Sequence, residues 1–372
     1  MAEYLTNSTD LTKVATAIRE KGGTSDSLVY PDGFVTAIGE ITTGVELSII
    51  VSVTSGSVVT ATKGATVISG TAVNGSCTLI VPEAGVWSVK ATRNGQTSNT
   101  VSVSVKDSYA LTLSFVSAVL NNNDWATIKT VSDKGEGANY WSVGDRKAIT
   151  LSGTVGALTL SNVTTYVFII GFNHNSGVEG TNRIHFQLGK TALSGGTDVA
   201  LCDRYYNNTG GGFRMNTSNS NSGGWASSNM RTAICGTSLS SYSGTIIAVI
   251  PAALRAVLKS VTKYTNNTGN SSAASAVTAT TDYFFLLSEY EVFGSTTYAN
   301  SNEASKQEQY SYYSAGNSKV KYNHSATSTA VSWWLRSPCA SYSTRFVLVS
   351  TVGTVAVTDA VFSIGFAPGF CV

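Results

Sequence analysis

The spacing of hydrophobic positions changes along the chain and divides it into three segments. Near the N-terminus, Leu11, Val14, Ala15 and Ile18 recur at the spacing of one helix face, and a second short amphipathic stretch follows at 34–38. The pattern predicts a small helical segment over residues 1–43. A segment of this size cannot bury a sufficient core alone, so we expect it to pack on a partner chain or on another copy of itself.

The second segment, residues 44–106, alternates apolar and polar positions. The runs at 86–91 and 101–105 have a period of two, and turn signals such as Asn74-Gly75 and Asn94-Gly95 separate the runs. Several short strands at this spacing predict a β-sandwich. We interpret Trp87 as a core residue, with a platform for a sugar as the alternative, and 106–108 is the expected boundary.

The third segment, residues 110–372, has a mixed pattern. Short strands are expected at 167–170, 246–250 and 283–287, and a helix is expected to start at Pro251. Long polar loops are expected at 207–228 and 265–280. The chain as a whole is therefore predicted to be a multidomain α+β protein.

Motifs late in the chain resemble a widespread domain of unknown function from Gram-positive bacteria and their phages. They are DYFFLLSEYEVFG at 282–294, QEQYSYYS at 307–314 and SWWLRSP at 332–338, with GDRKAITLSG and RIHFQLGK fitting its earlier part. The resemblance covers most of 120–372 and implies a C-type-lectin-like fold of the formylglycine-generating-enzyme type. It implies that Trp333, Trp334 and Leu335 form a buried frame. Arg336 would be a buried donor to loop carbonyls, or alternatively a ligand-binding residue.

Two earlier stretches also resemble known modules. TNSTDLTKVATAIREKGGTSDSLVYPDGFVTAIGEI is similar to the N-terminal segment of many tail proteins from phages of Gram-positive bacteria, which implies attachment to a tail. PEAGVWSVKATRNGQTSNTVSVSV is similar to the end of immunoglobulin-like or carboxypeptidase-regulatory-like modules, which serve as spacers in tail proteins.

The C-terminal stretch has an unusual composition. Lys, Glu, Gln, Met and Trp are absent from residues 336–372. An Asn codon with its adenines randomised can encode none of these five residues, and the residues present are ones it can encode. The stretch thereby resembles the variable region, at about 339–364, of a diversity-generating retroelement target. Members of the resembling family have an Asn-rich template here, roughly RSP-N-A-N-N-S-N-N followed by further Asn with Gly and Val between. The positions that match its Asn residues, which we predict to bind ligand, are Cys339, Ser341, Tyr342, Thr344, Arg345, Leu348, Ser350, Val352, Thr354, Ala356, Val357, Asp359, Val361, Phe362 and Ile364.

Strand periodicity favours this assignment. In residues 346–350, Val347 and Val349 are expected on the core face, and Leu348 and Ser350 on the opposite face. Tyr342, Arg345 and Phe362 are the expected anchors, because aromatic and Arg side chains dominate binding hot spots. The alternative for Phe362 and Ile364 is ordinary core packing.

Charge excludes two classes of partner. Charged residues make up only 12% of the chain and the net charge is +2, with no basic stripe or basic amphipathic helix. We therefore expect neither nucleic-acid binding nor membrane insertion. The N-terminus has no signal-peptide pattern, so synthesis in a bacterial cytoplasm and later location in a virion are expected.

No pattern of catalytic or metal-binding residues stands out. His174, His185 and His324 lie far apart in the sequence, and we interpret them as surface or satisfied core residues. Glu289 and Glu291 would share one face of an expected strand, which is one arrangement for the paired carboxylates of a glycosidase, but they match the framework of the resembling family. The five cysteines are interpreted as scattered buried thiols. We expect no enzyme activity, no metal and no cofactor.

These features predict a phage tail fibre or tip adhesin. Its partners would be a host-cell surface receptor, either protein or glycan, and other tail proteins. A homo-oligomer is expected, with a trimer as first choice. A bacterial surface adhesin of the same fold is the alternative, and a glycan or cell-wall hydrolase is a further one.

Overall fold

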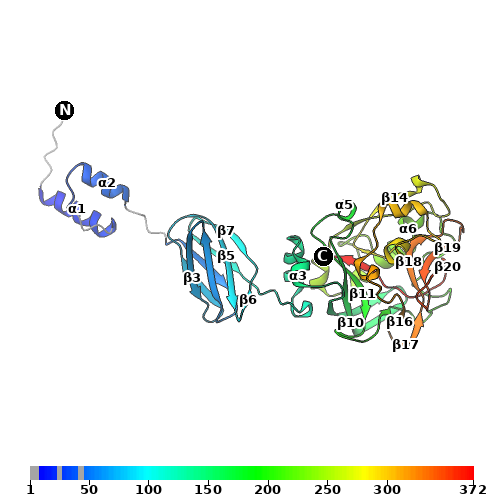
Figure 1. Ribbon diagram of the computed structural model, residues 1–372. Coiled ribbons are helices and arrows are strands. Elements are labelled where there is room, and N and C mark those ends of the chain that lie inside the picture. Colours follow the sequence, from blue (N-terminus) through cyan, green and yellow to red (C-terminus); the bar gives the residue numbers. More distant parts are fainter. Residues whose placement is uncertain (1–7, 23–26, 41–45) are drawn as a thin grey trace. The chain divides into compact units, whose positions relative to one another are not determined.

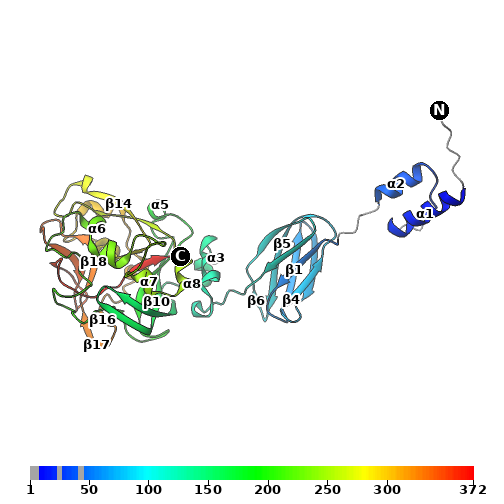
Figure 2. The ribbon, with the colours of Figure 1, turned by 180° about the vertical axis from the view of Figure 1, so that it is seen from behind.

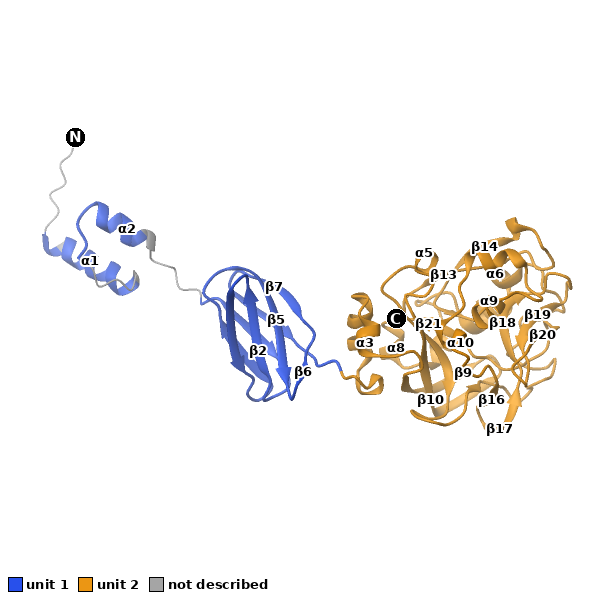
Figure 3. Cartoon of the chain, viewed as in Figure 1, with its two compact units in different colours: residues 1–116 blue, residues 117–372 orange. Residues whose placement is uncertain are grey.

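The chain forms two compact units, residues 1–116 and 117–372 (Figure 3). The computed structural model describes residues 8–22, 27–40 and 46–372. Several separate sheets are joined by short helices, in agreement with the predicted multidomain α+β class. In the described residues, no helix is both long enough and apolar enough to cross a membrane.

Two short helices begin the first unit. Helix α1 spans Ser8–Gly22 and α2 spans Asp32–Glu40. Their contact buries four side chains, Ala15, Ile18, Phe34 and Ala37. Residues 1–7, 23–26 and 41–43 of the predicted helical segment lie outside the described residues.

The rest of the first unit consists of two sheets around one core (Figures 1 and 2). One sheet has the order β4-β1-β8; in the other, of order β3-β2-β5-β6, β7 also pairs with β5. The strands are β1 Ser48–Ser52, β2 Val58–Lys63, β3 Thr66–Thr71, β4 Ser76–Ile80, β5 Gly85–Arg93, β6 Gln96–Thr97, β7 Val101–Val105 and β8 Ser108–Thr112.

Period-two alternation accounts for this core. In β5, Trp87, Val89 and Ala91 are buried while their neighbours are exposed, as predicted. The predicted boundary at 106–108 is wrong, however, because β8 lies beyond it and pairs in parallel with β1. The first unit therefore continues to Val116.

The second unit contains four sheets. Their orders are β15-β21-β11-β10-β9, β12-β16-β17, β13-β14 and β18-β19-β20. The strands are β9 Arg146–Val155, β10 Leu158–Phe172, β11 Ile184–Lys190, β12 Val199–Ala200, β13 Val261–Asn266, β14 Val277–Asp282, β15 Phe284–Phe285, β16 Lys321–Asn323, β17 Ala326–Val331, β18 Trp333–Pro338, β19 Arg345–Val349, β20 Val355–Asp359 and β21 Gly369–Cys371.

Short helices and helical turns connect these strands. They are η1 Leu120–Asn122, α3 Trp125–Asp133, α4 Gly137–Tyr140, α5 Ser176–Glu179, α6 Gly224–Ser227, η2 Met230–Cys235, α7 Ile246–Val249, α8 Ala252–Arg255, η3 Ala274–Ala276, α9 Glu289–Phe293, η4 Ser301–Lys306 and α10 Ser311–Ser314.

The beginning and the end of the second unit lie together. The C-terminal strand β21 pairs with β11 in the five-stranded sheet. The Ser132 hydroxyl of α3 donates a hydrogen bond to the carbonyl oxygen of Val372, and α3 lies beside the C-terminus in both views (Figures 1 and 2). The last residues of the chain therefore complete the sheet that the first strands of the unit start.

Several predicted elements differ from the structure. The expected strand at 246–250 is helix α7, and the helix expected from Pro251 ends at Arg255. The expected loop at 265–280 is confirmed over 267–276, which connect β13 and β14, while its ends belong to these strands. The expected strand at 283–287 is reduced to β15. Short apolar runs do not separate a strand from a buried helical turn, which explains the error at 246–250.

Candidate functional site

The predicted ligand-binding positions lie on and around the sheet β18-β19-β20. Among them, Ser341, Tyr342, Val352 and Thr354 are exposed. The half-buried positions are Thr344, Arg345, Ser350, Ala356, Val357, Asp359, Val361 and Phe362.

Three of the predicted positions are not available at the surface. Cys339, Leu348 and Ile364 are 0%, 5% and 2% exposed, so their assignment as surface contacts is wrong. Leu348 is buried because both faces of β19 are covered, and all residues from Phe346 to Val349 are buried. For Ile364, core packing was the alternative interpretation, and its burial agrees with it.

The register also divides the predicted positions between two faces of the sheet. Leu348 lies opposite Ala356, whereas Arg345 lies opposite Asp359 on the other face. Ala356 and Val357 are consecutive in β20 and therefore point in opposite directions. The predicted positions in β19 and β20 therefore do not all lie on one surface, and the exposed set is centred on the loop 339–345 and the turn 350–354.

The exposed set has its own polar contacts. The guanidinium of Arg345 lies 4.6 Å from the centre of the Tyr342 ring, a cation–π arrangement. The Arg345 Nε lies 3.4 Å from Asp359 Oδ1, which also accepts a hydrogen bond of 3.0 Å from the Thr344 hydroxyl. Tyr342 is 50% exposed and Val352 is 74% exposed. An aromatic ring, a cation and an aliphatic side chain are therefore available to a ligand.

Main-chain hydrogen bonds hold the exposed loop. The amide of Cys339 donates to the carbonyl of Arg345 at 3.0 Å, and the amide of Ala340 donates to Tyr298 at 2.8 Å. Farther along, the amide of Ala360 donates to the carbonyl of Thr344 at 2.8 Å and its carbonyl accepts from Asn216 at 3.0 Å. Beside this contact, a hollow of about 370 Å³ is lined by side chains such as Asn216, Thr217, Ser218 and Asn229. Only hydroxyl and amide residues line it.

The frame below the loop is fully buried, as the resemblance implied. Trp333, Trp334 and Leu335 are each 0% exposed. The indole of Trp333 donates to the carbonyl of Lys319 and that of Trp334 to the carbonyl of Phe213, both at 2.9 Å. Both indole groups are therefore buried at no cost in lost hydrogen bonds.

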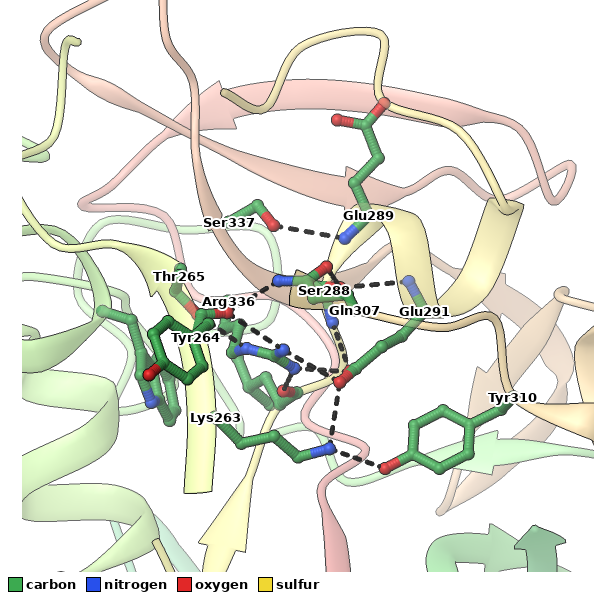
Figure 4. A network of polar contacts seen from close by, with 12 residues as sticks. Lys263, Tyr264, Thr265, Ser288, Glu289, Glu291, Gln307, Tyr310, Arg336 and Ser337 are labelled. Atoms are coloured by element: carbon green, nitrogen blue, oxygen red, sulfur yellow. Dashed lines mark hydrogen bonds and ion pairs between the residues drawn. The ribbon is translucent and has the colours of Figure 1, made fainter. Parts of the chain in front are cut away.

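Arg336 is a buried donor, as predicted, and its main partner is a carboxylate (Figure 4). Its guanidinium binds both oxygens of Glu291, at 2.5 and 2.9 Å, and donates to the carbonyl of Leu286 at 2.9 Å. Its Nε donates to the hydroxyl of Thr265 at 2.8 Å. These contacts join β18, α9 and β13. Because each nitrogen of the guanidinium already has a partner within the protein, Arg336 has no donor left for a ligand.

Lys263 extends the network to a second carboxylate. Its ammonium lies 2.7 Å from Glu179, 2.9 Å from Glu291 and 2.8 Å from the hydroxyl of Tyr310. Burial alone would raise the pKa of Glu291, but the charges of Arg336 and Lys263 outweigh it and lower that pKa. Two carboxylates therefore face two cations, which leaves the buried network close to neutral.

The histidines that lie far apart in sequence meet in this network. The rings of His174 and His185 are 5.6 Å apart, and His174 stacks on Tyr310 at 3.7 Å. Burial and the nearby Lys263 charge lower the pKa of His174 to about 3. Burial raises the pKa of Glu179 to about 7, with Lys263 acting in the opposite direction. Both residues are buried in the core, as interpreted, but Nε2 of His174 has no hydrogen-bond partner among the described residues, so His174 is not fully satisfied. His324 is half-buried.

The same cluster has the spacing of a metal site but is filled by protein groups. His174, Glu179 and Glu291 each place one possible ligand atom within 4.8 Å of the others. The Lys263 ammonium already bridges the two carboxylates, and both oxygens of Glu291 are held by Arg336. A divalent cation added beside these two cations would be repelled, so the residues do not fit a metal.

Glu289 and Glu291 do not form a catalytic pair. They lie in helix α9 and not in the expected strand, and the Glu289 carboxylate is directed away from Glu291 (Figure 4). Glu289 accepts hydrogen bonds from the amides of Thr297, Tyr298 and Ala299. Both residues are 0% exposed. The structure therefore gives them structural partners and no path to a substrate.

All five cysteines are buried and unpaired, as interpreted from the sequence. The sulfur of Cys371 lies 3.3 Å from His185 Nδ1, and burial raises the pKa of its thiol to about 12. Cys339 lies 3.6 Å from the Ser341 hydroxyl. The inert thiol form is favoured for Cys371, which argues against cysteine chemistry there.

Sequence reasoning missed the network around Lys263, although one signal was available. In a chain with few charges, the alternating polar residues of β11 are conspicuous, and all seven of its residues are buried. Gln187 donates to the carbonyl of Ala367 at 3.0 Å and accepts from the hydroxyl of Tyr313 at 2.6 Å. Polar alternation in this strand therefore marks an internal polar face and not a solvent-exposed one.

The C-terminal part of the chain matches a family model. Residues 198–372 match the family described as a domain of unknown function, DUF6273. A search of curated proteins found no match. The match covers less than half of the chain and begins inside the second unit, whose strand β21 pairs with β11 outside the matched region. The C-terminal part of the second unit is thus similar to this family, and the matched residues complete a sheet that begins before them.

Proposed function

We propose that this chain is a receptor-binding protein of a phage tail fibre or tip, with a ligand-binding face that a retroelement diversifies. The observation that supports it best is the contrast between the loop 339–345 with the turn 350–354 and the frame below them. The loop and turn expose Tyr342 and Val352, whereas Trp333, Trp334 and Leu335 are completely buried. A rigid frame that presents adaptable loops is the usual arrangement of binding sites that tolerate sequence change.

The proposed fold of the second unit is C-type-lectin-like. Adjacent chain ends and a sheet that contains both the early strands and the last strand favour it. An immunoglobulin-like identity is proposed for the two sheets of residues 48–112, whose core surrounds Trp87. In this scheme they act as a spacer between the tail and the receptor.

The proposed partners follow from the resemblances in the sequence. The N-terminal segment would attach to other tail proteins, and the ligand would be a protein or glycan on the host surface. We propose a homotrimer that is made in the bacterial cytoplasm and located in the virion. A bacterial surface adhesin of the same fold is the second candidate, because the binding face would serve it equally well.

Cell binding tests the receptor-binding proposal. The full-length chain, labelled with a fluorophore, would be incubated with a panel of Gram-positive bacteria and counted by flow cytometry. We expect binding to a subset of strains, and a loss of roughly 30-fold in affinity for Tyr342→Ala or Arg345→Ala, since a hot-spot side chain contributes about 2 kcal/mol or more. Val67→Ala on β3, an exposed change far from the face in sequence, is the control. Equal binding by all variants would contradict the proposed face.

Sequencing of the surrounding DNA tests the diversification proposal. We expect an imperfect repeat of the segment that encodes residues 339–364, with Asn codons at the predicted positions, close to a reverse transcriptase gene. The absence of any such repeat, together with an invariant face among phage isolates, would reject diversification while leaving receptor binding open.

A further inference from the structure

Asn221 contacts the exposed loop through an unusual number of hydrogen bonds. The residue is 1% exposed and precedes helix α6. Its main-chain N–H donates to the carbonyl oxygen of Ser343 at 2.7 Å. Its side-chain Nδ2 lies 2.7 Å from the carbonyl oxygen of Tyr342, 2.9 Å from that of Arg345 and 3.0 Å from that of Cys339.

Every one of these acceptors is a main-chain atom. Three of the four belong to predicted variable positions, namely residues 339, 342 and 345. A main-chain carbonyl is present whatever the side chain is, so the hydrogen bonds survive substitution at these positions. The contact therefore fixes the path of the loop without depending on its sequence.

The chemistry of the contact requires an amide or a similar donor. Three carbonyl oxygens converge on one nitrogen, and a primary amide provides two hydrogens to share among them. The reversed amide would place Oδ1 against three oxygens, so its orientation is set by electrostatics. In the described part of the chain, Oδ1 is buried and has no hydrogen-bond partner. The hydrogen bonds of Nδ2 to the loop offset the free-energy cost of leaving Oδ1 unpaired.

The β13-β14 hairpin and the start of α6 hold the main chain at Asn221. The carbonyl of Asn221 accepts a hydrogen bond of 3.0 Å from the amide of Gly224. The amide of Gly223 donates to the carbonyl of Thr268, in the β13-β14 connection, at 3.1 Å. A Cβ on Gly269 would lie 2.4 Å from the Asn221 carbonyl oxygen, so the hairpin packs directly on this residue. Asn221 thus connects the β13-β14 hairpin to the exposed loop.

We propose that Asn221 is a positioning residue that holds residues 339–345 in one backbone conformation for any set of side chains displayed there. The inference rests on the proposed function, because it explains how one face can change its sequence and remain ordered. Asn221 itself does not contact the ligand.

The test is amide hydrogen exchange of the full-length chain, followed by mass spectrometry of the peptide that covers 339–345. Asn221→Asp keeps the shape but replaces the donor by a carboxylate that faces three carbonyls. We expect exchange in this peptide to rise about tenfold or more, because the loop opens more easily without these hydrogen bonds. Asn219→Asp, an exposed change of the same type in the same segment, should leave it unchanged. Tyr342→Ser with Arg345→Ser should also leave it unchanged.

Two results would overturn the proposal. One is an unchanged peptide in Asn221→Asp, and the other is a rise in Tyr342→Ser with Arg345→Ser that equals the rise in Asn221→Asp. If Asn221→Asp fails to fold, Asn221→Ala removes the donor without adding charge and is judged by the same peptide. Exchange does not depend on a receptor. Local exchange as expected without binding to any cell would therefore support the positioning role and contradict the receptor-binding proposal alone.

Discussion

Arg336 and Arg345 carry the same charge in opposite surroundings. Arg336 is fully buried and bound to both oxygens of Glu291, whereas the pair Arg345–Asp359 is 40% and 34% exposed at its two side chains. A buried ion pair is costly to break, because the remaining partner is left as an uncompensated charge. An exposed pair contributes little, because water screens it.

This contrast predicts the effect of one substitution at two places. Arg336→Leu should lower the free energy of unfolding by about 3 kcal/mol or more, since Glu291 would lose its bidentate partner. Arg345→Leu should change it by less than about 1 kcal/mol. Chemical denaturation of both variants measures the difference. Similar losses in both would mean that Arg345 belongs to the frame.

His174 predicts how stability depends on pH. Its pKa is lowered from the ordinary 6.5 to about 3 by burial and by Lys263. Between these values the unfolded chain binds the extra proton and the folded chain does not, so stability falls as the pH drops below about 6.5. The slope from this residue is roughly 1.4 kcal/mol for each pH unit.

A comparison of variants isolates this contribution. The pKa of Glu179 is raised from 4.5 to about 7, so its contribution is present at low pH and is lost as the pH rises through about 7. The two residues therefore act in opposite directions in the wild type. The stability of His174→Gln relative to the wild type should rise as the pH falls from 6.5 towards 4, and should be constant above pH 7. A difference that is independent of pH would show that the pKa of His174 is the same in the folded and the unfolded chain.

At the scale of elements, the sheet β18-β19-β20 separates frame from face. Val347 in β19 is 0% exposed, whereas Val352 in the following turn is 74% exposed. Val347→Ala should cost about 2 kcal/mol, because it removes buried methyl groups and leaves a cavity. Val352→Ala should change stability by less than about half a kcal/mol. Thermal unfolding of the two variants tests the assignment, and an equal cost would contradict it.

The sequence allowed some elements to be predicted because their pattern has one buried face. In β5 and β7, Trp87, Val89, Val103 and Val105 are buried at alternate positions. By contrast, the frame at 332–338 is buried at every residue from Trp333 onward, and it was predicted from its resemblance to a known domain and not from periodicity. One-sided burial leaves a periodic trace that can be read without the structure.

Other elements could not be predicted because both of their faces are covered. Leu348 was expected outside, but both faces of β19 are covered, so its alternate residues are buried as well. Glu289 and Glu291 were expected in a strand. In the structure they belong to helix α9, which starts at a capping box formed by Ser288 and Glu291. Asn221 gave no signal among the many asparagines of the chain. Its role depends on contacts more than a hundred positions away in the sequence.

At the scale of the whole molecule, the helical pair at the N-terminus has more apolar surface than it can bury. Its core contains Ala15, Ile18, Phe34 and Ala37. Large hydrophobic side chains remain exposed on both helices and between them, at Val14, Val29, Tyr30, Val35 and Ile38. Such a concentration on so small a module is typical of a surface that contacts another chain.

Further copies of the same helices would cover this surface, as in the proposed homotrimer. Association of three chains would also present three faces to a cell, so that weak individual contacts combine into firm attachment. We therefore expect light scattering of the full-length chain at micromolar concentration to give three times the mass of one chain.

Val35 is 69% exposed on α2 and Val67 is 58% exposed on β3, so the two form a matched pair. Val35→Lys should shift the chain to a monomer, because a charge would be buried in the interface, whereas Val67→Lys should leave the trimer intact. A wild-type monomer would contradict the assembly, and a trimer that survives Val35→Lys would place the interface elsewhere in the chain.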